Sequence, residues 1–383
     1  MKIAILHNFA EHPGGGDLIM LDIIEALIEH NHSVTLITSY PQGLPKAIEH
    51  FSKDNTLFTT LKINKVKVPS IVKHPYNIYL TAKNIEDQLK KYDLIVISDD
   101  IPKPLLNSHK VLVYANYPHA ARIKLNELIP FKYRNTFKGK IVWKLHNYAF
   151  KHFFLLDWNH YNIHAIANST LTQKHIIKAL KPKHMDKIYP PVQTEKIAEL
   201  AKKTYQKDDL IVYIGRIQPE KGIEDLIKAI ATLKHLKLKA EIMGFLHSHQ
   251  YFRKIKQLIE RLDVKSKIEV IPNAPRNEIL RTLLKAKAIV HPAYYEPFGI
   301  AVVEGMAASC IPIVRRGFNG PWLDIIEEGK YGFGFSNIKE LAEIIEKIIK
   351  FYDGLDVKAV TSRALEFDRA KFKQKFVNIL RRL

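Results

Sequence analysis

The sequence contains one cysteine in 383 residues, Cys310. A single cysteine cannot form a disulfide within the chain, which is typical of a reducing compartment. No apolar run reaches the roughly 18 to 20 residues that span a bilayer as a helix. Met1 leads directly into a short apolar run, without the basic region and long apolar core of a signal peptide. These absences predict a cytoplasmic protein.

Acidic residues are scarce relative to basic ones. The chain has 59 lysines and arginines against 39 aspartates and glutamates, a formal net charge of +20. Residues 101–150 alone carry nine basic side chains and one acidic side chain. A basic surface attracts nucleic acid, anionic lipid or a phosphorylated substrate, and charge alone does not choose among them.

Short β-branched runs alternate with amphipathic helical segments along most of the chain. The expected strands cover residues 2–7, 33–39, 93–98, 111–116 and 164–169, then 209–216, 239–244, 267–272, 288–293 and 311–316. Strands that alternate with helices predict doubly wound parallel sheets. Pro190 and Pro191 interrupt the pattern between the two series. We therefore expect an α/β protein with two domains across a cleft, one covering residues 1–188 and the other beginning at residue 189.

Three consecutive glycines, Gly14 to Gly16, stand between the first apolar run and a helical pattern over residues 18–27. Strand, glycine loop and helix is the order found in phosphate-binding loops. The G-x-G-x-x-G spacing of dinucleotide folds is missing, and the acidic Asp17 follows the glycines. No acidic residue clearly ends the second expected strand, where the ribose of NAD requires one. The sequence therefore does not favour a dehydrogenase. Because Asp17 lies at the start of the adjacent helical pattern, we expect it to cap that helix.

The segment "GRIQPEKG" (residues 215–222) links an expected strand to an expected helix and carries Arg216 and Lys221. Both cations are close enough in sequence to reach one anion, and the helix start adds unpaired backbone N–H groups and positive dipole. Two cations that converge on a diphosphate would neutralise the charge that develops as it leaves. The alternative is a pair of solvated surface cations.

The segment "YEPFGIAVVEGMAASCIPIV" (residues 295–314) places Glu296 before an expected helix and Glu304 within it. Both carboxylates are candidates for accepting hydrogen bonds from sugar hydroxyls, and the helix start offers N–H groups to oxygen atoms. The alternative makes Glu296 a helix cap and Glu304 a solvated residue. The apolar neighbours of Glu304 disfavour a solvated face.

These two segments, with the spacing E-x7-E, resemble the retaining nucleotide-sugar glycosyltransferases of family 4, which have the GT-B fold of two Rossmann-like domains. Other stretches, "IYPPVQT", "VYANYPHA" and "FNGPWLDIIEEGKYGF", are similar to Alg-type mannosyltransferases that use GDP-mannose. The resemblance implies that a carboxyl-terminal helix over residues 364–383 returns to the first domain. The nucleotide-sugar domain would then cover residues 189–363.

The resemblance also implies roles for individual residues. Arg216 and Lys221 would hold the donor diphosphate without a metal ion, Glu304 would bind the ribose hydroxyls, and Glu296 would bind the donor sugar without acting as a nucleophile. The other residues expected at the donor, a GDP- or UDP-hexose, are Gly15, Gly16, Gly244, Phe245, Pro272, Asn273, Phe298, Gly299 and Ile300. The residues expected at the acceptor are Asp17, His119 and Arg122.

One position departs from the family pattern. Many relatives carry a histidine at the end of the strand that corresponds to residues 111–116, but this chain has Asn116 there and His119 three residues later. An asparagine can orient a hydroxyl but cannot act as a base at neutral pH. Asn116 and His119 are both candidates for the role of the family histidine. A surface histidine is the alternative for His119.

The segment of residues 122–156 mixes cations with aromatic side chains. The aromatic residues are Phe131, Tyr133, Phe137, Trp143, Tyr148, Phe150, Phe153 and Phe154. This mixture is typical of segments that bind anionic membrane surfaces, and it also suits single-stranded nucleic acid. Because no nucleic-acid motif is present, we expect no nucleic-acid partner. Packing of the aromatic residues into the domain core is a further alternative.

The sequence thus favours a retaining, metal-independent glycosyltransferase, peripheral on the inner face of the membrane, with a lipid-linked or glycan acceptor. One alternative is a soluble transferase or phosphorylase with a sugar or small-molecule acceptor. The other is a nucleotide- or polyanion-binding module without catalysis. The histidines near the amino terminus, His7, His12, His30 and His32, lack metal-ligand spacing and predict no metal site. The nucleobase, the sugar and the acceptor stay open.

Overall fold

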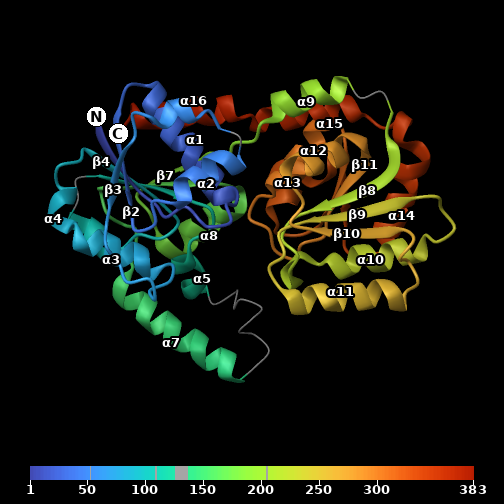
Figure 1. Cartoon of the computed structure of the whole chain (residues 1–383), viewed down its shortest axis with the longest axis horizontal. Helices are drawn as coiled ribbons and strands as arrows, with labels where there is room; N and C mark the ends of the chain where they lie inside the picture. The colour runs from blue at the N-terminus through green and yellow to red at the C-terminus, as the bar shows by residue number, and fades with distance from the viewer. Residues whose placement is uncertain (52, 108–109, 126–136, 204–205) are drawn as a thin grey trace. The chain divides into compact units, whose positions relative to one another are not determined.

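The computed structural model describes residues 1–51, 53–107, 110–125, 137–203 and 206–383 and divides into two compact units (Figure 1). The amino-terminal unit comprises Met1–Pro191 and Ala370–Leu383, and the carboxyl-terminal unit comprises Val192–Arg369. The chain passes from the first unit to the second directly after the proline pair. Each unit is built on its own parallel sheet.

In the amino-terminal unit, the described residues form a seven-stranded parallel sheet with the order β3-β2-β1-β4-β5-β6-β7. The strands are β1 (Lys2–Leu6), β2 (Ser33–Thr38), β3 (Lys62–Lys65), β4 (Leu94–Ser98), β5 (Val111–Ala115), β6 (Ile163–Ala167) and β7 (His184–Lys187). The helices are α1 (Gly15–Glu29), α2 (Gly43–His50), α3 (Tyr76–Asn84), α4 (Glu86–Leu89), α5 (His119–Leu125), α7 (Phe137–Phe153), α8 (Thr170–Leu180) and α16 (Arg369–Leu380).

The central strands of this sheet are buried on both faces, which explains their continuous apolar sequences. Ile3 and Ile5 of β1 pack on one face with residues of α1, α2 and α16. Ala4 and Leu6 point to the other face and pack with residues of α3, α5, α7 and α8. Alternate residues of one strand therefore serve two separate cores.

In the carboxyl-terminal unit, the part of the chain that is described forms a six-stranded parallel sheet with the order β10-β9-β8-β11-β12-β13. The strands are β8 (Asp208–Ile214), β9 (Lys239–Gly244), β10 (Ile268–Pro272), β11 (Ala286–His291), β12 (Ile311–Arg315) and β13 (Phe333–Phe335). The helices are α9 (Thr194–Lys202), α10 (Ile223–Thr232), α11 (His249–Arg261), α12 (Arg276–Lys285), α13 (Ile300–Ala307), α14 (Ile338–Phe351) and α15 (Val357–Ala364).

All ten predicted strands form, and the predicted α/β class with two doubly wound sheets is confirmed. Three strands were not predicted: β3, β7 and β13, which lie at sheet edges. Edge strands bury little surface, and β3 and β7 accordingly lack an apolar run.

The predicted helix over residues 364–383 is interrupted. A 3-10 turn at Leu365–Phe367 and the extended Asp368 precede α16. The carboxylate of Asp368 accepts hydrogen bonds from the hydroxyl of Thr194 and the backbone N–H of Glu195. These bonds hold the chain in the carboxyl-terminal unit up to the start of the returning helix.

The order of strands reverses at the centre of each sheet, between β1 and β4 in one unit and between β8 and β11 in the other. Ligands of doubly wound sheets bind beyond the carboxyl ends of the strands at such a reversal. The loops that follow these four strands are therefore where the chemistry of each unit is expected.

Candidate active site

The loop after β8 presents the two predicted phosphate-binding cations. Arg216 follows the strand, is exposed, and its guanidinium has no hydrogen-bond or ionic partner among the described residues. Lys221 lies in a 3-10 turn that leads into α10, and it is buried. Gly222 joins this turn to the helix with φ of +66°, and a Cβ there would lie 2.4 Å from the backbone oxygen of Pro292. The close approach of the β8 and β11 loops therefore requires glycine at this position.

Glu296, in the loop after β11, contacts the ammonium group of Lys221. The Nζ atom of Lys221 donates a hydrogen bond to Oε2 of Glu296. Nε2 of His291, the last residue of β11, lies 3.2 Å from the same oxygen. The backbone of the Glu296 loop is held by Asn319, whose Oδ1 accepts from the Glu296 N–H at 3.0 Å.

The charge of Glu296 is stabilised by these partners. Burial alone would raise the pKa of its carboxyl group, but the Lys221 charge and the hydrogen bonds from His291 and Lys221 lower that pKa well below its ordinary value. Glu296 is therefore an ionised carboxylate at neutral pH. The alternative assignment of this residue as a helix cap is wrong, because its side chain pairs with Lys221 and His291 and not with the start of α13.

Glu304 is a buried residue of α13 and pairs with Arg276, the first residue of α12. An Nη2 atom of Arg276 donates to Oε1 of Glu304. The side chain of Glu304 is 10% exposed, so the alternative assignment as a solvated residue is wrong. The pair places the Glu304 carboxylate, a hydrogen-bond acceptor, beside the positively charged Arg276 guanidinium.

Arg315, at the end of β12, connects the two loops that carry Lys221 and Glu296. Its guanidinium donates to the carboxylate of Asp225 in the first turn of α10, and its Nε donates to the Pro292 oxygen at 3.0 Å. The ring of Tyr294 lies 4.3 Å from the guanidinium, and its hydroxyl donates to Asp225 at 2.9 Å. The Arg315–Asp225 ion pair, whose side chains are 14% and 12% exposed, and the contact of Arg315 with Pro292 therefore fix the relative position of the two loops.

The predicted donor residues Gly244, Phe245, Pro272 and Asn273 lie side by side at the ends of β9 and β10. The backbone N–H of Asn273 donates to the oxygen of Gly244 at 2.8 Å, and its side chain accepts from the N–H of Leu246 at 3.0 Å. Phe245 is 38% exposed next to this contact. Pro272 ends β10 directly before Asn273.

The residues predicted at the start of α13 divide into buried and accessible ones. Gly299 is the N-cap, with φ of +104°, and Ile300 opens the helix. Phe298 is buried, with its ring 5.5 Å from that of Phe367. Phe298 can therefore offer only its backbone to a ligand.

In the amino-terminal unit, Gly15 and Gly16 open α1, with Gly14 as its N-cap. The carboxylate of Asp17 accepts from the backbone N–H groups of Gly14 and Ala10, at 2.9 and 3.2 Å. Nε2 of His7 lies 3.1 Å from the same carboxylate. Asp17 therefore has the predicted capping role, and its charge also meets a histidine that follows β1.

Asn116 follows β5 and is held by Asp99, which follows β4. The carboxylate of Asp99 accepts from the backbone N–H groups of Asn116 and Tyr117, at 2.7 and 2.8 Å. A Cβ built on Gly16 would lie 3.7 Å from Nδ2 of Asn116. The glycine loop and Asn116 are therefore neighbours at this edge of the sheet.

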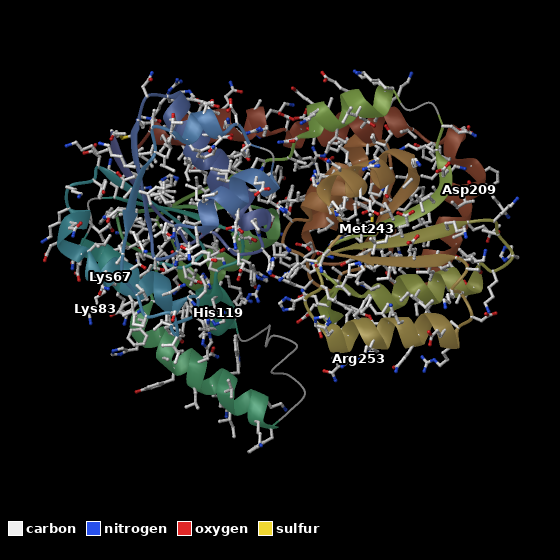
Figure 2. All side chains as sticks on the ribbon, in the orientation of Figure 1. Lys67, Lys83, His119, Asp209, Met243 and Arg253 are labelled. Atoms are coloured by element: carbon white, nitrogen blue, oxygen red, sulfur yellow. The ribbon has the colours of Figure 1, made fainter. Side chains whose placement is uncertain are left out.

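His119, the first residue of α5, lies beside α7 (Figure 2). Its Nε2 is 2.9 Å from Nε2 of His146, and its ring contacts Trp143 and Phe150 edge-on. Burial, with the nearby charges of His146 and Arg122, lowers the pKa of His119 to about 3. His119 is therefore neutral at physiological pH and is engaged within its own unit.

Arg122, one turn further along α5, stacks on an aromatic ring. Its guanidinium carbon lies 4.7 Å from the centre of the Tyr117 ring. The charge stays partly exposed.

Part of the predicted basic aromatic segment, residues 126–136, lies outside the described residues, and so do Phe131 and Tyr133. The remainder includes α7, which extends away from the sheet of its unit (Figure 1). Trp143 and Phe150 of α7 are buried. The apolar side chains on the outer part of this helix are exposed, namely Phe137, Ile141, Val142, Leu145 and Tyr148. Packing into the core, one of the predicted uses of the aromatic residues, is confirmed for Trp143 and Phe150. Membrane binding by the exposed side chains stays a prediction.

No helix among the described residues is both long and apolar enough to span a membrane.

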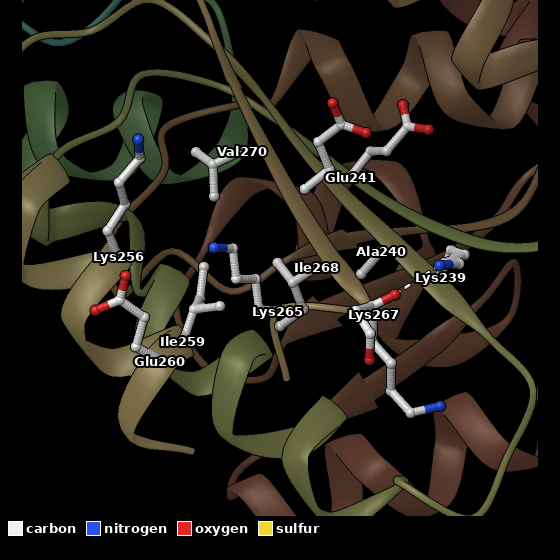
Figure 3. A pocket seen from close by; sticks show the side chains of 12 residues that line it. Lys239, Ala240, Glu241, Lys256, Ile259, Glu260, Lys265, Lys267, Ile268 and Val270 are labelled. Atoms are coloured by element: carbon white, nitrogen blue, oxygen red, sulfur yellow. Dashed lines mark hydrogen bonds between the residues drawn. The ribbon is translucent and has the colours of Figure 1, made fainter. Parts of the chain in front are cut away.

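A cavity of about 560 Å³ lies at a different place in the carboxyl-terminal unit, between α11 and the strands β9 and β10 (Figure 3). Lys239, Lys256, Lys265 and Glu260 are among its lining residues. It includes none of the loops after β8 and β11. Strand topology and the paired charges, and not cavity size, therefore define the candidate site.

Sequence reasoning missed four partners of the predicted residues: His291, Arg276, His7 and Asp99. Their positions at the end of a strand, directly after one, or at a helix start were the available signal. The pairings themselves join distant parts of the chain, and a local motif does not contain them.

Part of the chain matches a known protein family. Residues 194–356 match the family model described as "Glycosyl transferases group 1". This part of the chain is therefore a group 1 glycosyltransferase domain, and the two-sheet architecture is the GT-B fold that the sequence resemblance implied.

Among curated proteins, the chain is similar to several enzymes named GDP-Man:Man(3)GlcNAc(2)-PP-Dol alpha-1,2-mannosyltransferase, including a human and a fungal protein. The human protein is 32% identical over 200 residues, which are 48% of this chain and 40% of the relative. The Neurospora crassa protein is 26% identical over 248 residues, which are 56% of this chain and 44% of the relative. The match thus spans less than half the length of these relatives.

Several solved structures resemble the whole chain, including a synthase and a glycosyltransferase. Sucrose-phosphate synthase from Thermosynechococcus elongatus has a TM-score of 0.72 at 15% identity and covers 100% of this chain and 98% of its own. A glycosyltransferase from Rickettsia africae has a TM-score of 0.68 at 18% identity, with 98% and 96% covered. At these identities the likeness concerns the fold.

Proposed function

We propose that the chain is a retaining glycosyltransferase that moves a hexose from a nucleoside diphosphate sugar to a lipid-linked or glycan acceptor. The observation that carries this proposal is the ion pair of Lys221 with Glu296 at the strand reversal of the carboxyl-terminal unit. Arg216 lies exposed in the same loop as Lys221. Because the curated relatives are named for GDP-Man, GDP-mannose is the first donor to test. UDP-hexoses are the second.

In this mechanism the protein stabilises the leaving diphosphate with fixed charge. Arg216 and Lys221 bind the phosphate oxygens, and the first turn of α10 adds the positive end of its dipole. These groups take the role that a metal ion has in other transferases, so the proposed reaction is metal-independent. Glu304 accepts a hydrogen bond from the ribose, and Glu296 accepts one from the sugar.

The proposed role of Glu296 is binding and not nucleophilic attack. Its charge is already shared with Lys221 and His291, which lowers its reactivity toward carbon. Retention then results from attack of the acceptor on the face that the diphosphate leaves. In the amino-terminal unit, Asn116, His119, Asp17 and Arg122 remain the proposed acceptor residues, and Gly15 and Gly16 the proposed phosphate-approach residues.

We also propose that α7 binds the membrane surface that carries the acceptor. Its exposed apolar side chains are interleaved with Lys138, Lys140 and Lys144. Apolar side chains enter the headgroup region while lysines meet anionic lipid, and this is the usual composition of interfacial helices. The proposed location is the cytoplasmic face of a membrane, with the chain bound peripherally.

The experiment that tests the function is sugar transfer by the full chain. Radiolabelled GDP-mannose, UDP-glucose and UDP-N-acetylglucosamine are each incubated with lipid-linked oligosaccharides and with soluble oligosaccharides. The proposal expects transfer from one donor class, with Glu296→Gln reduced at least about 100-fold, as for lost transition-state contacts. Transfer to soluble sugars with no lipid requirement favours the alternative of a soluble transferase. Absence of transfer from every donor contradicts the proposal.

A further inference from the structure

Two buried aromatic residues lie behind the candidate site on neighbouring strands, Tyr213 of β8 and His291 of β11. Their rings stack with centres 6.5 Å apart and an angle of 13° between planes. The hydroxyl of Tyr213 donates to the backbone oxygen of Arg216 at 3.0 Å, whereas the His291 ring contacts Glu296. Each strand thus supplies a ring that supports the ligand loop following it.

The tautomer of His291 follows from its surroundings. Glu296 is ionised, so Nε2 of His291 must carry a proton to donate to it. Nδ1 of His291 is buried without a hydrogen-bond partner among the described residues. A second proton, on Nδ1, would give the buried ring a positive charge and an N–H group with no acceptor, which is strongly unfavourable. Burial, assisted by the Lys221 charge, accordingly lowers the pKa of His291 despite the opposing effect of Glu296.

The two donors that reach Glu296 use the same oxygen atom. Lys221 and His291 both donate to Oε2. Oε1 has no hydrogen-bond partner within the described chain. The carboxylate is therefore held by one oxygen, and the other is available to a ligand.

Lys221 and His291 differ in what they can do when a ligand binds. The proposed function assigns Lys221 to the donor diphosphate. When the donor is bound, the ammonium group of Lys221 therefore donates to both the phosphate and Glu296. His291 is 3% exposed, so it stays with Glu296.

We infer that His291 is a positioning residue that orients Glu296, so that Oε1 receives a hydroxyl group of the donor sugar. This inference rests on the proposed function, because it concerns the sugar of a nucleotide donor. His291 should therefore affect binding of the donor sugar and not binding of the diphosphate.

The test compares binding of GDP and GDP-mannose to the full chain carrying His291→Phe or His291→Gln. Phenylalanine keeps a ring against Tyr213 but has no hydrogen-bond donor. Glutamine carries an amide N–H group that can extend about as far toward Glu296 as the histidine N–H. For His291→Phe, we expect GDP affinity within about twofold of the wild type and a loss of about tenfold or more in GDP-mannose affinity and kcat/KM, as for a hydrogen bond to a charged group. His291→Gln should recover part of this loss. If the wild type prefers uridine nucleotides, UDP and UDP-glucose take the same places.

Two results overturn the inference while the proposed function stands. One is a His291→Phe variant with wild-type GDP-mannose affinity and kcat/KM. The other is an equal loss of GDP and GDP-mannose affinity in both variants, with a lowered unfolding temperature, which means that the ring serves only packing. A wild-type chain that binds neither nucleotide sugar contradicts the proposed function itself.

Discussion

Lys221 and Glu296 form an ion pair across 75 residues of sequence, at the ends of the neighbouring strands β8 and β11. Their side chains are 11% and 16% exposed. The pair joins the residue proposed to hold phosphate to the residue proposed to hold sugar. Removing one member therefore affects both stability and binding.

The first prediction concerns stability. Lys221→Ala leaves the Glu296 carboxylate largely buried without its cation, and breaking such a pair costs about 3 kcal/mol. Adding Glu296→Gln to Lys221→Ala removes the unpaired charge and should restore part of this loss. Urea unfolding of the two single variants and the double variant gives the coupling energy.

Arg216→Ala is the matched control for this experiment, because Arg216 is exposed. Its free energy of unfolding should stay within about 0.5 kcal/mol of the wild type. Additive effects of the Lys221 and Glu296 substitutions would contradict the structural pairing.

The second prediction concerns Glu304 and the ribose. The wild type should bind GDP about tenfold more tightly than 2′,3′-dideoxy-GDP, because a hydrogen bond to a charged acceptor is lost. Glu304→Gln should bind the two nucleotides with nearly equal affinity. Glu343→Gln, on the exposed surface of α14, is the control and should keep the wild-type ratio. If Glu304→Gln keeps the wild-type ratio of affinities for GDP and 2′,3′-dideoxy-GDP, another residue binds the ribose hydroxyls.

The third prediction concerns α7. Leu145 and Tyr148 are 65% and 80% exposed, and replacing both with serine removes apolar groups worth about 1.5 to 3 kcal/mol each when fully buried. Sedimentation with phosphatidylglycerol vesicles should show binding reduced by about tenfold or more.

The control for the α7 experiment is Phe351→Ser, a change of an exposed apolar residue, 62% exposed, in the carboxyl-terminal unit. It should bind vesicles like the wild type. Equal binding of the wild type to neutral vesicles at high salt would remove the electrostatic part of the membrane proposal.

The fourth prediction concerns pH and Asp100, whose carboxylate accepts from the backbone N–H groups of His119 and Ala120 at the start of α5. Burial, with the nearby charge of Asp99, raises the pKa of Asp100 from 3.8 to about 7. Between these values the folded state binds more protons than the unfolded state, so stability falls as pH rises from about 4 to about 7. The shift corresponds to roughly 4 kcal/mol.

Thermal and urea unfolding at pH 5, 6, 7 and 8 measure this dependence. Asp100→Asn cannot ionise and should lose less stability than the wild type over the same interval. If the free energy of unfolding falls equally steeply with pH in the wild type and in Asp100→Asn, another group causes the pH dependence.

The central strands and the charged loops could be predicted from sequence because their signals are local. A strand buried on both faces needs a continuous apolar run, and "GRIQPEKG" carries two cations within one strand-to-helix loop. The edge strand β7, with the sequence "HMDK", buries too little surface to leave such a signal.

The partners of the site residues could not be predicted in the same way. Arg276 reaches Glu304 only because β10, followed by α12, lies in the same sheet as the strand before α13. The contact between His7 and Asp17 could not be predicted, because nothing in the local sequence of His7 indicates that Asp17 folds back toward it. The interruption at Asp368 depends likewise on Thr194, far away in the sequence.

Calorimetric titration of GDP and UDP into the full chain tests whether the loop after β8 binds a nucleoside diphosphate. We expect the wild type to bind one of these nucleotides at one site per chain. Arg216→Ala and Lys221→Ala should each weaken binding by about tenfold or more, as for lost charge-assisted hydrogen bonds to phosphate, while Arg216→Ala keeps the wild-type unfolding temperature. Failure of the wild type to bind either nucleotide, or unchanged affinity in both variants, would contradict the account.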